Sequence, residues 1–187
     1  MNAFLVICAV VVALVLAVIS IYNSLIGKRN QVSNIYAGVD TQLKKRYDLI
    51  PNLVAAVKEY LTHEREVLTK VTELRNEAMA AKNDAQKFDL NNKISTLLGN
   101  IKVAVENYPE LKANENVLHL QSTLTEVEEQ ISAARRAYNG AVMDYNNACE
   151  MFPTNLVANF FRFEKREFFA ADESEKVAPN VSDMFKR

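Results

Sequence analysis

An uninterrupted apolar run near the start of the chain constrains its fold more than any other feature. Residues 4–21 read FLVICAVVVALVLAVISI and contain no charged side chain. At about 1.5 Å per residue, a helix of this length is just long enough to cross the roughly 30 Å hydrocarbon core of a bilayer. Tyr22 follows where an aromatic ring suits the interface, and Lys28 and Arg29 then end the apolar stretch. The run predicts a transmembrane anchor over residues 1–22.

The main alternative for this run is a cleaved signal peptide. No basic residue precedes the run and no small-x-small site ends it, so we expect it to be retained as an anchor. A lipoprotein at Cys8 is disfavoured by the large Ile7 before it. The nearby basic residues lie only after the span, which favours a bulk domain in the cytoplasm. We therefore predict a single-pass protein of the plasma (inner) membrane, with an extracytoplasmic bulk domain as the alternative.

Beyond the anchor, the apolar residues recur with helical periods. Leu25, Val32 and Val39 are spaced by seven, and Leu43 continues the same pattern. No turn signal follows Tyr22, and the whole chain has only four glycines and four prolines, too few for a many-stranded sheet. We predict an all-α protein whose N-terminal transmembrane helix continues into an elongated antiparallel helical bundle over residues 23–152.

Prolines mark the expected interruptions of this bundle. Pro51 lacks an N–H group and should kink or break the first helix, so that a second helix runs from about Leu53 to Ala81. A third helix should end before Pro109, which suits the first turn of the next one. That last helix should continue for about ten turns and end at Pro153. Residues 153–187 are then an aromatic C-terminal segment and a polar tail, expected to be mobile beyond Asp172.

Residues with catalytic or metal-binding capacity form no recognisable motif. His63-Glu64 begins like a zinc protease helix, but Val67 stands where the second histidine should be. His119 is the only other histidine, and no Glu-x-x-His pair of a di-iron bundle is present. The glycines are isolated, so no phosphate-binding loop is indicated. We expect no enzymatic activity, no bound metal and no cofactor.

Composition disfavours two further classes. The formal charge of −1 provides no basic field, so no nucleic-acid partner is expected. The two cysteines, Cys8 and Cys149, lie far apart in the chain, and a disulfide framework is not expected.

The densest basic cluster is a candidate interaction site. It contains Lys44, Lys45 and Arg46, followed by Asp48, and could contact lipid phosphates or an acidic partner. The alternative, which we favour, is local pairing, because Asp40, Lys44 and Asp48 follow one another at i+4 steps. Such pairs contribute a few tenths of a kcal/mol each to a helix, roughly.

A second candidate site is a run of aromatic residues near the C-terminal end. Five phenylalanines alternate with charged residues: Phe160, Phe161, Phe163, Phe168 and Phe169. They could cap the bundle, dock a neighbouring subunit or insert between lipid headgroups. Capping is the favoured interpretation, followed by subunit docking.

Several short blocks carry a resemblance to a known family. They are Tyr22-Asn23-x-Leu25-Ile26-x-x-Arg29-Asn30-x-Val32, Asp40-x-Gln42-Leu43-Lys44-Lys45-Arg46-x-Asp48-Leu49-Ile50-Pro51-Asn52-Leu53-Val54, Lys58-x-Tyr60, His63-Glu64, Glu106-Asn107-Tyr108-Pro109-Glu110-Leu111-Lys112-Ala113, Ala134-Arg135-Arg136-x-Tyr138-Asn139, Tyr145-Asn146 and Phe152-Pro153-x-Asn155-Leu156. These blocks resemble the LemA family over nearly the whole chain. One departure is Ile35-Tyr36, where the family commonly has an alanine-tryptophan pair.

The resemblance implies a membrane-anchored antiparallel helical bundle. A relative in magnetosome-forming bacteria is linked to membrane vesicle formation, and other members are associated with membrane proteases and envelope stress. Some relatives carry lipoprotein signals, which place their bundles outside the cytoplasm. We therefore expect a non-enzymatic scaffold that binds membrane lipid, forms homo-oligomers through coiled-coil packing and organises or remodels the membrane. The alternative is an adaptor that presents its bundle to another membrane protein, such as a protease or another envelope protein.

Overall fold

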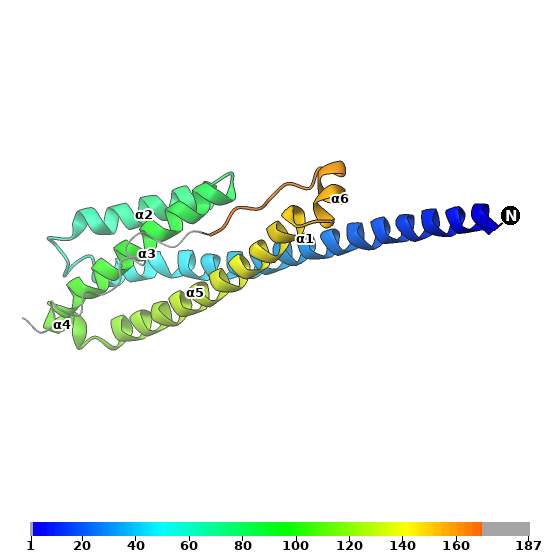
Figure 1. Cartoon of the computed structure of the whole chain (residues 1–187). Helices are drawn as coiled ribbons and strands as arrows, with labels where there is room; N and C mark the ends of the chain where they lie inside the picture. Colours follow the sequence, from blue (N-terminus) through cyan, green and yellow to red (C-terminus); the bar gives the residue numbers. More distant parts are fainter. Residues whose placement is uncertain (1, 170–187) are drawn as a thin grey trace, which may run out of the picture. The chain divides into compact units, whose positions relative to one another are not determined.

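The computed structural model describes residues 2–169, and in this part of the chain it contains helices and turns but no strand (Figure 1). The all-α fold class with a long apolar N-terminal helix is therefore confirmed. The polar tail expected beyond Asp172 lies outside the described residues. The helices are α1 (Asn2–Val57), α2 (Arg65–Ala80), α3 (Asp84–Glu106), α4 (Pro109–Lys112), α5 (Glu115–Glu150) and α6 (Thr154–Phe160).

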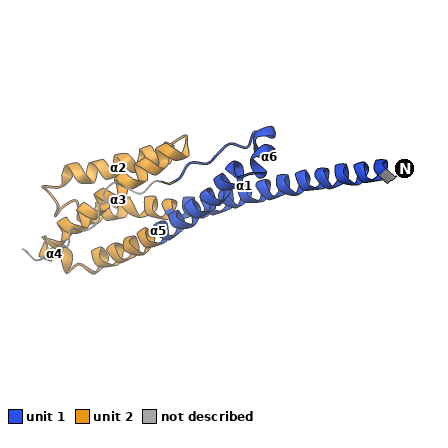
Figure 2. Cartoon of the chain, viewed as in Figure 1, with its two compact units in different colours: residues 1–42, 130–168 blue, residues 43–129, 169–187 orange. Residues whose placement is uncertain are grey.

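The chain divides into two compact units (Figure 2). Unit 1 comprises Met1–Gln42 and Gln130–Phe168, so it combines the first part of α1 with the end of α5 and with α6. Unit 2 comprises Leu43–Glu129 and Phe169–Arg187, and its described part combines the end of α1 with α2, α3, α4 and the start of α5. Inside unit 2, α2 and α3 pack side by side.

The first helix does not break at the proline where a kink or break was expected. It continues through Pro51 to Val57, and the chain turns only between α1 and α2. A proline at position 51 leaves the carbonyl of Tyr47 without its usual donor four residues later. Arg75 on α2 supplies the replacement, because its Nε donates to the Tyr47 carbonyl at 2.6 Å. The predicted helix from Leu53 to Ala81 is therefore wrong at its start.

The remaining helix ends follow local signals. Asn83 caps α3, with its side-chain oxygen accepting from the Gln86 N–H at 2.8 Å. Pro109 is the first residue of α4, as its fixed φ favours, but α4 has only four residues. The long helix expected to begin there is instead α5, which starts at Glu115 and spans 36 residues.

The heptad-spaced residues of α1 face the interior, as the sequence predicted. Leu25, Val32 and Val39 are almost completely buried in unit 1, and Leu43 is buried in unit 2. Full burial of one such side chain contributes about 1.5–3 kcal/mol. Unit 1 also buries apolar and aromatic side chains of α5 and α6, namely Tyr138, Val142, Tyr145, Val157 and Ala158.

Candidate functional site

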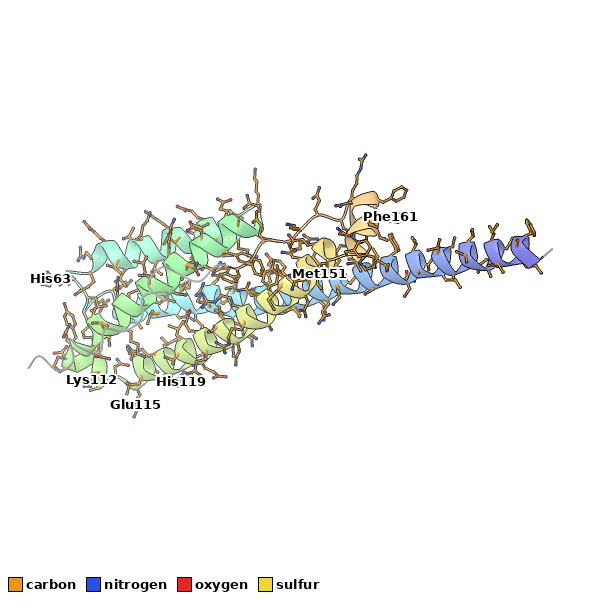
Figure 3. All side chains as sticks on the ribbon, in the orientation of Figure 1. His63, Lys112, Glu115, His119, Met151 and Phe161 are labelled. Atoms are coloured by element: carbon orange, nitrogen blue, oxygen red, sulfur yellow. The ribbon has the colours of Figure 1, made fainter. Side chains whose placement is uncertain are left out.

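No other part of the described chain covers the side chains in the first turns of α1. All residues from 3 to 20 are exposed, although most of them are large and apolar (Figure 3). Among the described residues, α1 is the one helix long and apolar enough to cross a membrane, by length and composition. Such a surface is unfavourable in water and favourable in hydrocarbon. It is compatible with a single-pass membrane protein.

A second feature of α1 is a stripe of small and short polar side chains. The members alternate at steps of four and three residues, which places them along one side of a helix. They are all exposed and all lie in unit 1: Ala13, Ala17, Ser20, Ser24, Gly27, Gln31, Asn34, Gly38 and Thr41. We call this stripe the α1 seam. A Cβ atom added at Gly27 or Gly38 would meet nothing within 4 Å, so packing within the described chain does not require glycine there.

The α1 seam was not predicted from the sequence, although its signal is present there. The large apolar residues that led to the helix prediction mark only the buried side of α1. A search for small residues at the same 3.5-residue period would have found the exposed stripe as well.

The predicted basic cluster separates into an exposed part and a buried part. Lys44 pairs with Asp48 at 2.9 Å on the exposed face, so the expected local pairing is observed. Lys45 is exposed too. Arg46 is completely buried and therefore lies inside unit 2, where no outside partner contacts it. Whether the exposed members contact lipid or protein stays a prediction.

Arg46 joins three helices through its guanidinium group. Nη1 donates to the Ser95 hydroxyl on α3 at 2.7 Å and to the Glu128 carboxylate on α5 at 2.8 Å. Nη2 donates to the Asn91 carbonyl at 3.2 Å and also to the Asn91 side-chain oxygen. The planar fork of arginine suits this kind of simultaneous recognition. The residue therefore holds α1, α3 and α5 together within unit 2.

The neighbours of Arg46 complete the network. Tyr47 donates its hydroxyl to the Asn91 side-chain oxygen at 2.9 Å, and the Asn91 amide donates to the Lys87 carbonyl at 2.7 Å. The Ser95 hydroxyl donates to the second oxygen of Glu128 at 3.0 Å. Both carboxylate oxygens of Glu128 are thus engaged. Loss of one partner from such a network destabilises the fold, because the remaining polar groups stay shielded from water but no longer have a hydrogen-bond partner.

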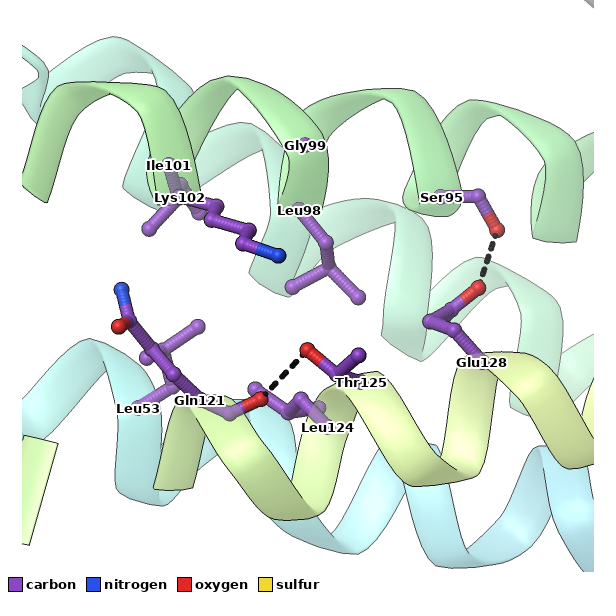
Figure 4. A pocket seen from close by; sticks show the side chains of 10 residues that line it. All are labelled: Leu53, Ser95, Leu98, Gly99, Ile101, Lys102, Gln121, Leu124, Thr125 and Glu128. Atoms are coloured by element: carbon purple, nitrogen blue, oxygen red, sulfur yellow. Dashed lines mark hydrogen bonds between the residues drawn. The ribbon is translucent and has the colours of Figure 1, made fainter. Parts of the chain in front are cut away.

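A cleft of about 210 Å³ lies next to this network in unit 2. Figure 4 shows Ser95 and Glu128 at one end of it and Lys102 with Gln121 at the other. Its apolar lining comes from Leu53, Leu98, Ile101 and Leu124. Within residues 2–169, no group of three His, Cys, Asp or Glu side chains could hold a metal ion. His63 and His119 are both exposed, and His63 lies in the turn between α1 and α2.

The phenylalanines of the predicted aromatic site have different environments. In unit 1, the rings of Phe161 and Phe163 pack against Tyr22, with centroids 4.8 and 5.7 Å away. In unit 2, Phe169 is buried and stacks on Phe88 at 4.1 Å. Phe160 is 80% exposed and Phe168 is 49% exposed. The Phe160 ring also meets the Phe161 ring edge-on at 5.0 Å, so Phe160 remains mostly exposed but is not isolated from the chain.

Side chains of α5 fix the extended segment 163–168 in unit 1. The hydroxyls of Tyr145 and Tyr138 donate to the carbonyls of Glu164 and Glu167 at 2.9 and 3.0 Å. Asn146 pairs with both backbone groups of Arg166, at 2.9 Å each. Burial raises the pKa of Tyr145 to about 12, so its hydroxyl remains a donor at neutral pH.

The turn between α6 and this segment contains an unusual backbone conformation. Arg162 has a φ of 55°, in the left-handed region that favours glycine. The Phe163 N–H donates to the Ala158 carbonyl at 2.9 Å, and the Arg162 N–H donates to the Asn159 carbonyl at 3.2 Å. These bonds form a Schellman motif with arginine at the position where glycine is usual.

A cationic pocket of about 200 Å³ lies beside this turn in unit 1. It is lined by Arg29, Arg162, Tyr145, Phe163, Glu164, Lys165 and Arg166. The Arg29 guanidinium lies over the Phe163 ring, 5.5 Å from its centroid, and Lys165 pairs with Glu150. The guanidinium groups of Arg162 and Arg166 have no ion pair or hydrogen bond with any residue from 2 to 169.

Comparison with known proteins confirms the resemblance drawn from the sequence blocks. The model of the LemA family matches residues 35–182. Protein LemA of Metamycoplasma hominis is 26% identical over 163 residues, which cover 87% of this chain and 74% of that protein. Magnetosome protein MamQ 2 of Paramagnetospirillum magneticum is 32% identical over 72 residues, covering 38% of this chain and 26% of the relative.

A third relative extends the same comparison. Magnetosome protein MamQ of Magnetospirillum gryphiswaldense is 25% identical over 87 residues, covering 45% of this chain and 32% of the relative. The matches therefore span about a quarter to a third of the length of the magnetosome proteins. None of these names describes a reaction.

Proposed function

The chain belongs to the LemA family, and from this premise we propose that it is a non-enzymatic scaffold that self-associates and thereby organises or remodels the membrane. Family membership and the exposed apolar start of α1 together indicate a membrane-associated protein. The scaffold would be anchored by the first turns of α1, and its copies would pair along the α1 seam.

The observation that carries this proposal is the continuity of the α1 seam across the end of the apolar run. Within the span, Ala13 and Ala17 are four residues apart, and Ser20 and Ser24 repeat this spacing across its end. Small residues at such spacing let helices approach closely in a bilayer. Beyond the span, side chains such as Gln31 and Asn34 can hydrogen-bond across a helix pair. One helix therefore couples pairing in water to pairing of the anchors.

The glycines of the α1 seam strengthen the argument. Each glycine in a helix interior costs about 1 kcal/mol relative to alanine. Gly27 and Gly38 incur this cost although an added Cβ would meet nothing within 4 Å, as is also true of Gly99 and Gly140 outside the seam. Close approach of a second helix provides a reason for glycine that the described fold of one chain does not.

The experiment that tests self-association replaces the seam glycines with a bulky residue. We expect the full chain in mild detergent to form oligomers by mass photometry, and the double variant Gly27→Leu, Gly38→Leu to shift to monomers. Helix content by circular dichroism should be unchanged or higher, because glycine is removed from a helix. Ser33→Leu is the matched control, since Ser33 is exposed on α1 outside the seam and should leave association unchanged.

A wild-type chain that is monomeric at every concentration would contradict the scaffold proposal. The adaptor function would then be favoured, in which the bundle is presented to another membrane protein such as a protease. Remodelling itself is tested by electron microscopy of vesicles containing the chain. We expect vesicle shape to change with the wild type and not with the double glycine variant.

The side of the membrane is a separate part of the proposal. Lys28 and Arg29 are the first charged residues after the span, which supports a cytoplasmic bulk domain. The chain allows a simple assay, because Cys149 is buried and Met79 is 57% exposed. In intact cells, a membrane-impermeant maleimide should fail to label Met79→Cys in a Cys8→Ser, Cys149→Ser background. Labelling would place the bulk domain outside the cytoplasm.

A further inference from the structure

We propose that the end of unit 1 formed by α6 and the turns around it is a second membrane contact, which binds the headgroup of an anionic phospholipid in its cationic pocket. The inference depends on anchorage through α1 and not on self-association, so it applies equally to a monomer. We call this region the α6 surface, formed by Met151, Phe152, Leu156, Phe160 and Arg162.

The position of Tyr22 sets the depth of the α6 surface. Tyr22 immediately follows the apolar run, at the level where aromatic rings prefer the membrane interface. The rings of Phe161 and Phe163 contact Tyr22 within the same compact unit. Figure 3 shows Phe161 beside α1. If α1 spans a bilayer, α6 therefore lies at the level of the headgroups.

The apolar side chains of the α6 surface are mostly exposed, although the Phe160 ring also meets the Phe161 ring edge-on at 5.0 Å. Phe160 and Phe152 are 80% and 79% exposed, and Met151 and Leu156 are 63% and 60% exposed. The face of α6 that packs on the rest of unit 1 is formed by Val157 and Ala158, which are buried. A short helix with one face packed on its own protein and large apolar residues on the other fits the boundary between headgroups and acyl chains.

The charge next to these residues selects the kind of lipid. Four cations and a single carboxylate line the cationic pocket. Lys165 is engaged with Glu150, and Arg29 lies over Phe163, which leaves the guanidinium groups of Arg162 and Arg166 without a partner among residues 2–169. Guanidinium groups bind phosphate oxygens with paired, charge-assisted hydrogen bonds. A phosphate diester carrying net charge, as in phosphatidylglycerol, matches this lining.

The backbone at Arg162 provides a further, independent observation. A Schellman motif favours glycine at this position, and arginine must adopt a φ of 55° to occupy it. The backbone alone gives no reason for arginine here. Arg162 lines the cationic pocket, and binding of an anion there would explain why arginine occupies a strained backbone position.

The absence of tryptophan from the sequence makes the lipid contact measurable. In Phe160→Trp, the new indole is the only one in the full chain, and its emission reports the surroundings of the α6 surface. In nanodiscs of phosphatidylcholine with phosphatidylglycerol, we expect blue-shifted emission that brominated acyl chains quench strongly. Met143→Trp is the control, because Met143 is exposed on α5 about 12 Å along the helix from Met151. Its emission should be quenched weakly.

A titration tests the headgroup. Phosphatidylglycerol added to the Phe160→Trp chain in neutral detergent should shift the emission, and Arg162→Gly should weaken this response about fivefold. Because glycine suits the backbone there, Arg162→Gly should keep or raise the melting temperature, which separates loss of the lipid from loss of the fold. Arg136→Gln, an exposed change elsewhere on α5, should leave the response unchanged.

Three results would overturn the proposal. Emission of the Phe160→Trp chain that ignores brominated lipid would mean that the α6 surface is in water. A response reproduced by inorganic phosphate alone would assign the pocket to a free anion. A shift that follows protein concentration would assign the surface to a second copy of the chain. The double variant Gly27→Leu, Gly38→Leu should leave the lipid response intact, so failure of the scaffold proposal is distinguishable.

Discussion

Arg46 in unit 2 and Arg162 in unit 1 have opposite surroundings. Arg46 is completely buried in unit 2, where Ser95, Asn91 and Glu128 accept hydrogen bonds from its guanidinium group. Arg162 is exposed in unit 1, and its guanidinium has no partner among residues 2–169. Groups that satisfy one another stabilise the fold, whereas the open charged and apolar groups of unit 1 are the ones that we propose to contact the membrane.

The comparison predicts its largest effect at Arg46. Arg46→Met should lower the free energy of unfolding of the full chain by about 2–4 kcal/mol, because the buried Asn91 and the partly exposed Glu128 would lose their cationic partner. Chemical denaturation followed by circular dichroism measures this loss. Lys45→Met, at the exposed neighbouring position, should change stability by less than about 0.5 kcal/mol.

The double variant Arg46→Met, Glu128→Leu sharpens this test. Replacing a buried ion pair with apolar residues of similar volume is often neutral, so the second change should restore much of the stability. If Arg46→Met lowers the free energy of unfolding by less than about 1 kcal/mol, Arg46 is not a structural residue, and its contrast with Arg162 fails.

The next largest effect concerns Arg75, which replaces the hydrogen bond that Pro51 cannot make. Arg75→Leu should cost about 1–3 kcal/mol, because the buried carbonyl of Tyr47 would lose its donor. In a Pro51→Ala background the new N–H can bond to that carbonyl, and the cost should fall. A double-mutant cycle measures the coupling. Equal costs in both backgrounds would show that Arg75 stabilises unit 2 in some other way.

The same residues show how far the sequence could predict this structure. Regular spacing is a local signal, and it correctly predicted the helical fold and the burial of Leu25, Val32 and Val39. The predicted break at Pro51 was wrong because its compensation comes from Arg75, 24 residues later in the chain. Local sequence does not identify such a partner.

The candidate sites divide along the same line. Pairing of Lys44 with Asp48 follows from i+4 spacing and was predicted. The burial of Arg46 was not, because its partners Asn91 and Glu128 are 45 and 82 residues away. The phenylalanine cluster was recognised as a group, but its members were not distinguished, because Phe169 stacks on Phe88 and Phe161 packs on Tyr22, both far away in the chain.

Arg162 gives the opposite prediction to Arg46, because its replacement should stabilise the fold. An arginine side chain is unfavourable at the positive φ of this position. Arg162→Gly should raise the free energy of unfolding by about 1 kcal/mol, since glycine adopts a positive φ without the steric cost. Arg162→Ala removes the same charge but keeps the Cβ atom, and it should give no gain. Denaturation of both variants measures the difference. Equal stabilities would mean that the strain at this turn is negligible.

The smallest effect concerns Tyr145, a group of unit 1 whose hydroxyl is used internally although it lies beside the open cationic pocket. Tyr145→Phe should cost about 1 kcal/mol at pH 8, where the hydroxyl donates to the Glu164 carbonyl. Burial raises its pKa to about 12, above the usual value of about 10. A raised pKa in the folded state gives stability that is complete below pH 10 and is lost between about pH 10 and 12. Because phenylalanine does not ionise, the wild type should lose roughly 1.4 kcal/mol relative to Tyr145→Phe by pH 11, which closes the gap and makes the variant slightly the more stable chain. A stability difference that stays constant from pH 8 to 11 would show that this hydroxyl ionises as freely in the folded chain as in the unfolded one. Tyr145 would then not be a buried donor, and the contrast between the satisfied interior of unit 1 and its open surface would fail at this residue.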